Sequence, residues 1–353
     1  MIVFKTAFVI IGAIIGAGFA SGKEIFEYFA KFGIYSLLFV IPLFVFFYFF
    51  IYTYLKFGEN HANFDLKKFS SSIGKNYKLF NVSFNIYNVG LFFTFLVLCS
   101  AMFSGLVSLF STYLPSGHKL LYFLASLVIT IVLVKTSFKS FKLLSNLVVP
   151  LIVLFVIINV VCSLGSGNFC TDFGFSNVLP LPFLTIAYAS QNTFFSSFVI
   201  IKLGSNLNKK QRAQTSFLTS LVICLLITLG ILCFLFNPKL AYCDMPFVEV
   251  AISINPVFSV LFATIIFGSI ITTHATCLTS LKEFFKGEKK YNNTTVMIAL
   301  IILLSLLNFG KIVQYLYPLI GVFGLIYFYK ICNYDKSQKM LVVPKFVENK
   351  REK

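Results

Sequence analysis

The sequence predicts an all-α integral membrane protein with about ten transmembrane helices. Apolar runs of 18 or more residues recur along the chain, 58% of the residues are hydrophobic and only 12% are charged. Soluble domains carry about a quarter charged residues, whereas apolar runs of this length can cross the hydrocarbon core of a bilayer. Further runs follow the first one directly, so we do not expect it to be a cleaved signal peptide.

Ten segments are expected to span the membrane, and no shift in composition separates a soluble domain from them. We therefore expect one transmembrane domain over residues 1–353, ending in a basic cytoplasmic tail at 331–353. The expected spans are 5–30, 34–56, 84–112, 119–135, 142–164, 179–202, 214–237, 250–282, 293–309 and 312–330.

The positive charge indicates the orientation of these spans. With ten spans, 24 of the 29 lysine and arginine residues fall in the loops of one side and in the tail. Cytoplasmic loops of membrane proteins collect these residues, so we expect both termini in the cytoplasm. We therefore interpret the net charge of +17 as topology rather than as nucleic-acid binding.

The first segment contains an unusual stretch, "GAIIGAGFASGKE", from Gly12 to Glu24. Glycine in a helix interior costs about 1 kcal/mol relative to alanine, and unwound backbone in a membrane is tolerated only beside protein or a water-filled cavity. A break here would expose amides that bind a carboxylate. The substrate-binding residues expected on this stretch are Gly16, Ala17, Gly18, Ser21 and Gly22. Close helix packing through small residues is the alternative.

Glu24 follows the break and belongs to a short charged pattern. An ionisable residue inside a membrane is a functional candidate, and here it would gate the site or relay a proton; alternatively, it faces water. Lys23 and Glu27, and Glu27 and Lys31, form i,i+4 pairs that suit an outer vestibule.

The link between the second and third segments, residues 57–81, is rich in lysine. We expect it to form a helix lying on the membrane surface.

The sixth segment carries a second polar interruption, "YASQNTFFSS". With five helices in each half, the second half enters the membrane in the opposite orientation, which is the inverted-repeat plan of many secondary transporters. The expected repeats cover about 5–164 and 179–330, with helices one and six broken. The substrate-binding residues expected here are Tyr188, Ser190, Gln191, Asn192 and Thr193.

The stretches "IGAGFASGKE" and "YASQNTF" resemble the YkvI family of bacterial membrane proteins. That family is similar to the amino acid–polyamine–organocation (APC) superfamily, whose first helix carries an IG-small-G motif, matched here by Ile15 to Gly18. The resemblance implies the LeuT-type fold and a bacterial plasma membrane. It also implies that the Gly16–Gly18 amides hold a substrate carboxylate and that Ser190 to Thr193 face the amino group and side chain.

The eighth segment, "GSIITTHATCLTS", offers hydroxyl groups for a sodium ion. Many LeuT-fold symporters hold sodium between helices one and eight with an adjacent pair of hydroxyl residues. By this resemblance Thr272 and Thr273 are that pair, with the carbonyls of Gly12 and Ile15 as partners; Thr276 is a further ligand candidate. The alternative is that these threonines bond back to their own helix. In the same segment, His274 is a proton-coupling candidate or a structural residue.

No P-loop, nucleophile elbow or HExxH motif occurs in the sequence, so we expect neither ATP coupling nor proteolysis, and no enzymatic activity. Eight cysteines show no metal spacing; Cys170 and Cys243, both in expected outer loops, leave a disulfide open. We expect a secondary transporter of a small amino-acid-like solute with no cofactor other than sodium. The alternatives are a non-transporting receptor with the same fold and a proton-coupled porter.

Overall fold

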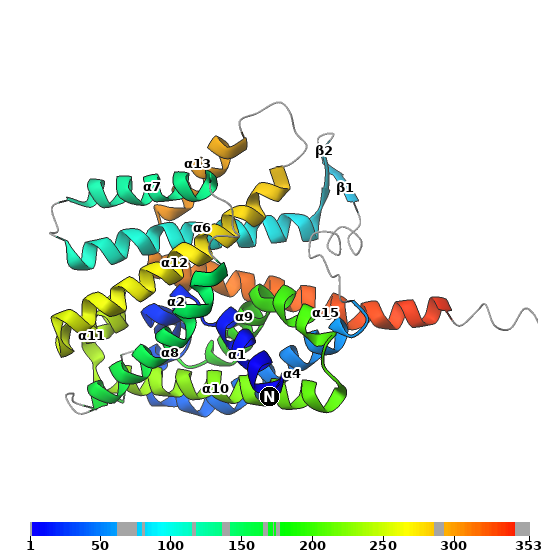
Figure 1. The fold of residues 1–353 in the computed structure, drawn as a ribbon, viewed down its shortest axis with the longest axis horizontal. Coiled ribbons are helices and arrows are strands. Elements are labelled where there is room, and N and C mark those ends of the chain that lie inside the picture. Colours follow the sequence, from blue (N-terminus) through cyan, green and yellow to red (C-terminus); the bar gives the residue numbers. More distant parts are fainter. Residues whose placement is uncertain are drawn as a thin grey trace, which may run out of the picture.

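The computed structural model describes residues 2–61, 76–79, 82–114, 118–135, 142–164, 169–171, 173, 177–285 and 293–342. This part of the chain is helical (Figure 1) apart from one antiparallel hairpin, β1 (Asn76–Leu79) with β2 (Val82–Asn85). Five of its helices are long and apolar enough to cross a bilayer: Ala30–Gly58, Tyr87–Tyr113, Lys209–Phe236, Pro256–Lys282 and Phe309–Tyr334. The chain is a multi-pass membrane protein.

Each of the ten expected segments is helical. The first five correspond to α1 (Ile2–Ile14) with α2 (Ala17–Ser21) and α3 (Lys23–Tyr28), then η1 (Ala30–Phe39) with α4 (Val40–Gly58), α6 (Ile86–Tyr113), α7 (Lys119–Lys135) and α8 (Lys142–Leu164). The next three are α9 (Leu181–Gly204), α10 (Lys209–Phe236) with η4 (Pro238–Tyr242), and α11 (Pro246–Ile254) with α12 (Pro256–Phe285). The last two are α13 (Asn293–Ser305), and α14 (Phe309–Lys311) with η5 (Ile312–Leu316) and α15 (Tyr317–Val342).

The first segment is interrupted, as predicted from its glycines, but at two positions rather than one. Gly16 has extended backbone (φ −109°, ψ −168°) and separates α1 from α2. Gly22 has φ +83°, a left-handed conformation that favours glycine, and separates α2 from α3.

The predicted break in the sixth segment is wrong, because α9 continues from Leu181 to Gly204 without interruption. Its polar side chains satisfy the helix instead of opening it: the Asn192 amide donates to the Tyr188 carbonyl (3.0 Å) and the Thr193 hydroxyl to that of Ala189 (2.7 Å). The segment has no glycine or proline between Phe183 and Leu203 to force a break.

Three smaller expectations are also corrected. The eighth segment is two helices, because Asn255 is extended and Pro256 begins α12. In the link expected as a surface helix, residues 76–79 form a strand, and 62–75, 80 and 81 lie outside the described residues. The expected tail begins as helix, since α15 runs on to Val342; residues 343–353 are not described.

The helices form two groups. α6 packs against α7, α12 and α13; in Figure 1, α6, α7 and α13 lie in the upper part, and α12 rises diagonally towards them from α11. In the other group α4 packs against α9 and α10, and α1 packs against both α9 and α10 (Figure 1). α8 contacts α10 and α12, and α15 contacts α9, α4 and α6. The broken first helix therefore lies beside the buried α9, and its segment α2 contacts α12 of the other group.

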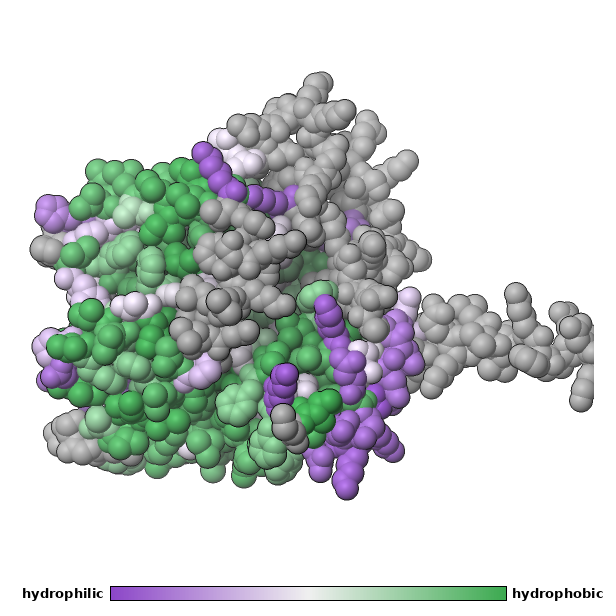
Figure 2. Space-filling view, in the orientation of Figure 1, coloured by the Kyte–Doolittle hydropathy of each residue, from purple (hydrophilic) through white to green (hydrophobic). Residues whose placement is uncertain are grey.

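The surface agrees with a membrane-embedded molecule. Figure 2 shows that hydrophobic residues cover most of the described surface on this face, while hydrophilic residues gather near the α9–α10 connection. The helix ends at that connection carry Lys202 of α9 and Lys209 and Lys210 of α10, which belong to the side expected in the cytoplasm.

Candidate functional site

The interruption between α1 and α2 borders open space. Gly16 is partly exposed, and a Cβ added to it would meet no atom within 4 Å. Its extended backbone conformation is open to any residue, so the conformation does not require glycine here. The absence of a side chain instead leaves the space beside the backbone open. Ala17 to Ser21 are all buried, and the Ser21 hydroxyl donates to the Gly18 carbonyl (2.8 Å). The break thus combines an accessible first residue with a buried short helix.

Glu24 and Tyr28 lie one helical turn apart on α3, on the face that turns towards the break and α9. Glu24 is 7% exposed, and its carboxylate lies so close to Gly18 that a Cβ there would overlap it. Tyr28 is 1% exposed and donates a short hydrogen bond to the side-chain oxygen of Gln191 on α9. Glu24 therefore belongs to the interior and does not face bulk water.

Three buried tyrosines from three elements lie close enough to this carboxylate to be affected by its charge. Tyr28, Tyr188 of α9 and Tyr317 of α15 each interact electrostatically with Glu24. The Tyr28 and Tyr188 rings are 4.9 Å apart between centroids. Tyr317 directly follows η5, a π-helical turn of a kind found at many functional sites, and η5 packs against α3. We call Glu24, Tyr28, Tyr188, Gln191 and Tyr317 the central cluster.

Of the five residues expected on α9, Tyr188 and Gln191 meet the first helix. Ser190 instead donates to the Gly321 carbonyl of α15 (2.8 Å). Asn192 and Thr193 bond back to carbonyls of α9. Ser196 belongs to the polar stretch of the sixth segment but was not among the expected binding residues; it donates to the Ala13 carbonyl (2.8 Å) and so satisfies a carbonyl near the end of α1.

Lys23 and Glu27 of α3 and Lys31 of η1 form a group of buried and partly buried charges. Lys23 and Lys31 each lie 3.4 Å from a Glu27 carboxylate oxygen, which confirms the two expected pairs. Lys23 also donates to the Cys243 carbonyl (3.2 Å), and its side chain lies against Gly310 of α14. It thereby ties α3 to the loop before α11 and to α14.

A pocket of about 480 Å³ lies beside this group of charges. Its walls include Phe26 and Glu27 of α3, Lys239 and Tyr242 of η4, and Gln314 of η5. Cys243, next to this wall, carries a free thiol, so the disulfide left open from the sequence is not formed. Burial, and secondarily the charge of Glu249, raises the pKa of that thiol.

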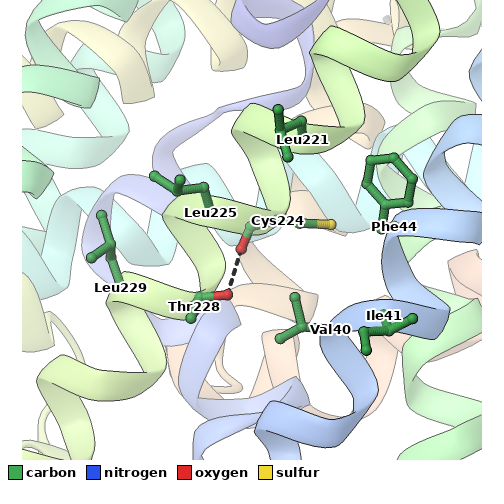
Figure 3. A pocket seen from close by; sticks show the side chains of 8 residues that line it. All are labelled: Val40, Ile41, Phe44, Leu221, Cys224, Leu225, Thr228 and Leu229. Carbon is green, nitrogen blue, oxygen red and sulfur yellow. Dashed lines mark hydrogen bonds between the residues drawn. The ribbon is translucent and has the colours of Figure 1, made fainter.

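A second pocket, of about 500 Å³, lies between α4 and α10 and has a different chemistry (Figure 3). Thr228 is its one hydroxyl among the lining residues, and it donates to the Cys224 carbonyl (2.8 Å). Ile41 and Leu225 are 74% and 54% exposed on its rim. Apart from Thr228 and the Cys224 thiol, the lining residues of this groove have apolar side chains, so the groove suits an apolar occupant better than a polar solute. Its lining residues are Val40, Ile41, Phe44, Leu221, Cys224, Leu225, Thr228 and Leu229.

The expected sodium ligands on α12 lie on a helix that packs against α2. Thr272 donates to the Ser269 carbonyl (3.0 Å) and Thr276 to the Thr272 carbonyl (2.8 Å), as in the back-bonding alternative. Their oxygen lone pairs stay available for a cation. Thr273 is partly exposed, as is Gly12, while Ile15 is 2% exposed. The sodium site stays a prediction.

His274 lies in the contact between α12 and α7. It is fully buried, and its Nε2 lies 3.2 Å from the Thr130 hydroxyl oxygen. Since that hydroxyl donates to the Ser126 carbonyl (2.9 Å), it accepts from His274. This contact joins α12 to α7, and a role of His274 in proton coupling stays a prediction.

Comparison with known proteins supports the membrane assignment. No family model matches the chain. It is 23% identical over 335 residues, or 91% of this chain and 92% of the relative, to "Uncharacterized membrane protein YkvI" of Bacillus subtilis (strain 168). The chain is therefore a distant full-length homologue of that membrane protein.

Proposed function

We propose that this protein is a secondary active transporter that moves a small amino-acid-like solute across the bacterial plasma membrane by alternating access, and that it is not an enzyme. The solute binds between the break of the first helix and the central cluster. The observation that carries this proposal is a twice-interrupted membrane helix whose break meets a buried carboxylate and three buried tyrosines. Intramembrane ionisable groups and discontinuous helices mark substrate paths in transporters.

The packing of the helices supports the finer fold assignment, a five-plus-five inverted repeat of the LeuT type as in the APC superfamily. We number the ten expected spans 1 to 10 and pair each span of the first half with the span five places later. In the matched contacts, two spans pack against each other and their two paired spans also pack against each other. Such matching is expected when two halves are related by a pseudo-two-fold axis. The matched contacts are α1–α10 with α9–α4, α6–α7 with α12–α13, α7–α12 with α13–α6, α8–α10 with α15–α4, α8–α12 with α15–α6, and α1–α8 with α9–α15.

The group of charges at Lys23, Glu27 and Lys31 supports a closed outer side in this conformation. Lys23 joins α3 to the loop before α11, and Lys23 and Glu27 are buried, at 7% and 8% exposed. The pocket above them then serves as the outer vestibule. With both termini in the cytoplasm, as the lysine and arginine bias supports, this vestibule opens to the outside.

The ion that drives transport has two candidates. Sodium would bind Thr272 and Thr273 with the carbonyls of Gly12 and Ile15, because α12 packs beside the broken helix. A proton would bind Glu24 or His274. Glu24 is the stronger proton candidate because it belongs to the central cluster.

Net flux separates transport from sensing. The purified protein is reconstituted in liposomes and exposed to each of the twenty radiolabelled amino acids under an inward sodium gradient, an inward proton gradient, or neither. We expect at least one amino acid to accumulate above equilibrium under one gradient. Binding without net flux would instead support a receptor.

A matched pair of variants ties the flux to the site. In Gly18→Leu the new side chain would occupy the place of the Glu24 carboxylate, so uptake should be lost. In Gly105→Ala on α6 the nearest atoms to the added Cβ are 3.6 Å away, so uptake should persist. Equal uptake by both variants would place the solute site elsewhere.

A further inference from the structure

Glu24 is a buried carboxylate that the described residues leave without a charge partner. It is 7% exposed and presses against Gly18, and in this part of the chain it makes neither an ion pair nor a hydrogen bond. Its neighbour Glu27, equally buried, is paired with both Lys23 and Lys31. An ionised carboxylate is costly to bury unless a positive group compensates it. The described residues therefore supply no cation to Glu24, and either a proton or a cationic ligand must neutralise it.

The surroundings of Glu24 suit an organic cation. Tyr28, Tyr188 and Tyr317 are each 1% exposed and interact electrostatically with Glu24. Phe29 adds a ring 5.2 Å from that of Tyr188. Aromatic rings present a negative face, and an ammonium group near such faces is stabilised, more so when it is desolvated. Lys23, one residue before Glu24, is held by Glu27 and the Cys243 carbonyl.

Gln191 adds a hydrogen-bond donor that has no partner in the described part of the chain, which complements the acceptor that Glu24 provides. It is fully buried, and its side-chain oxygen accepts the hydrogen bond from Tyr28. Its Nε2 donor has no partner among the described residues. Buried donors are normally hydrogen-bonded, so this nitrogen can serve an acceptor oxygen on a ligand. Since Tyr28 bonds Gln191 and interacts with Glu24, the anionic acceptor and the unused donor belong to the same cluster.

We propose that Glu24 binds the ammonium group of the solute within the tyrosines of the central cluster, while Gln191 Nε2 donates to the solute's carboxylate or carbonyl oxygen. The inference rests on the proposed function, which makes this cluster the solute site. It assigns the substrate class: amino acids and related amines bind, and carboxylates that lack an amine do not.

Three matched ligand sets test this assignment on the purified full-length protein by thermal stabilisation. Each set contains an amino acid, its amine alone and its carboxylate alone: alanine, ethylamine and propionate; leucine, 3-methylbutylamine and 4-methylpentanoate; phenylalanine, phenethylamine and 3-phenylpropionate. We expect the amino acid of at least one set to bind tightest, its amine to bind measurably, and its carboxylate to bind at least tenfold more weakly than its amine.

Two variants and a control identify the groups responsible. Glu24→Gln should weaken both the amino acid and the amine at least tenfold. Gln191→Leu should weaken the amino acid and leave the amine unchanged, because the amine has no carboxylate for Nε2 to bind. Glu249→Gln on α11 removes a carboxylate outside the cluster and should leave the ranking unchanged. If Glu24→Gln does not fold, the Gln191→Leu result decides.

The outcomes separate this inference from the proposed function. A carboxylate that binds as tightly as its amino acid, or a Glu24→Gln variant that still binds amines as the wild type does, overturns the inference, although such binding still supports a solute site. If Glu24→Gln binds normally and loses only the pH dependence of flux, Glu24 carries a proton and the inference is wrong. No binding by any compound, together with no flux of any amino acid, overturns the proposed function itself.

Discussion

Methyl groups added at Gly16 and Gly18 should separate the space for the solute from the stability of the fold. Gly16→Ala adds a Cβ with no atom within 4 Å, at a backbone conformation open to any residue. Gly18→Ala adds a Cβ that would overlap the Glu24 carboxylate. Gly105→Ala is the matched control in the interior of α6, where the closest atoms lie at 3.6 and 3.7 Å.

The expected magnitudes follow from these contacts. Overpacking of a buried site costs about 1–3 kcal/mol, so Gly18→Ala should lower the free energy of unfolding by about that amount or displace Glu24. Gly16→Ala meets nothing and should change stability by less than about 0.5 kcal/mol. Gly105→Ala should be neutral or stabilising by up to about 1 kcal/mol, because alanine favours a helix over glycine.

Ligand affinity then shows whether the solute occupies the space beside Gly16 or Gly18. If the solute uses the space at Gly16, that variant should keep its thermal midpoint and lose affinity for the amino acid that stabilises the wild type most. A loss of about 1.4 kcal/mol in binding free energy corresponds to tenfold in the dissociation constant. Affinity is measured by titration with thermal unfolding as the readout. Wild-type affinity in both Gly16→Ala and Gly18→Ala would refute the placement of the solute at this break.

Three further predictions concern residues outside the central cluster. Lys23→Ala removes the hydrogen bond to the Cys243 carbonyl, and hydrogen bonds to charged groups contribute about 1.5–3 kcal/mol. Cys243 should therefore be alkylated roughly tenfold faster, as measured by mass spectrometry of its peptide. An unchanged rate would mean that Lys23 does not hold the loop before α11. Because burial raises the pKa of the Cys243 thiol and only the thiolate reacts, its alkylation rate should keep rising to a higher pH than in the unfolded chain, and coincident pH profiles would contradict this. Thr130→Val removes the acceptor for His274 and should lower stability by about 1–3 kcal/mol with ligand affinity unchanged; a change in affinity would instead place His274 in the site.

The local features of the first segment could be predicted from the sequence because they depend on residues close together in the chain. Glycines at 16 and 22 interrupt the helix where the pattern indicated, and the Lys23–Glu27–Lys31 pairs form because i,i+4 side chains share a helix face. The same spacing connects Glu24 to Tyr28. Tyr28 was therefore within reach of sequence reasoning and was missed.

The second break was mispredicted because polarity was taken as a sign of unwinding. Asn192 and Thr193 bond to their own helix, and such back-bonds leave α9 intact. Tyr317 could not be found from the sequence, because only packing of the turn Ile312–Leu316 against α3 brings it to Glu24. The unpaired state of Glu24 likewise depends on tertiary contacts that no local pattern reports.

The most direct test of the account is where a bound amino acid lies in an experimental structure of the purified protein, saturated with the amino acid that stabilises it most. The account predicts ligand density bounded by Gly16 to Gly18, Glu24 and Gln191, with the amine beside Glu24. Density confined to the pocket beside Phe26 and Glu27, or to the groove between α4 and α10, with an empty break, would contradict it.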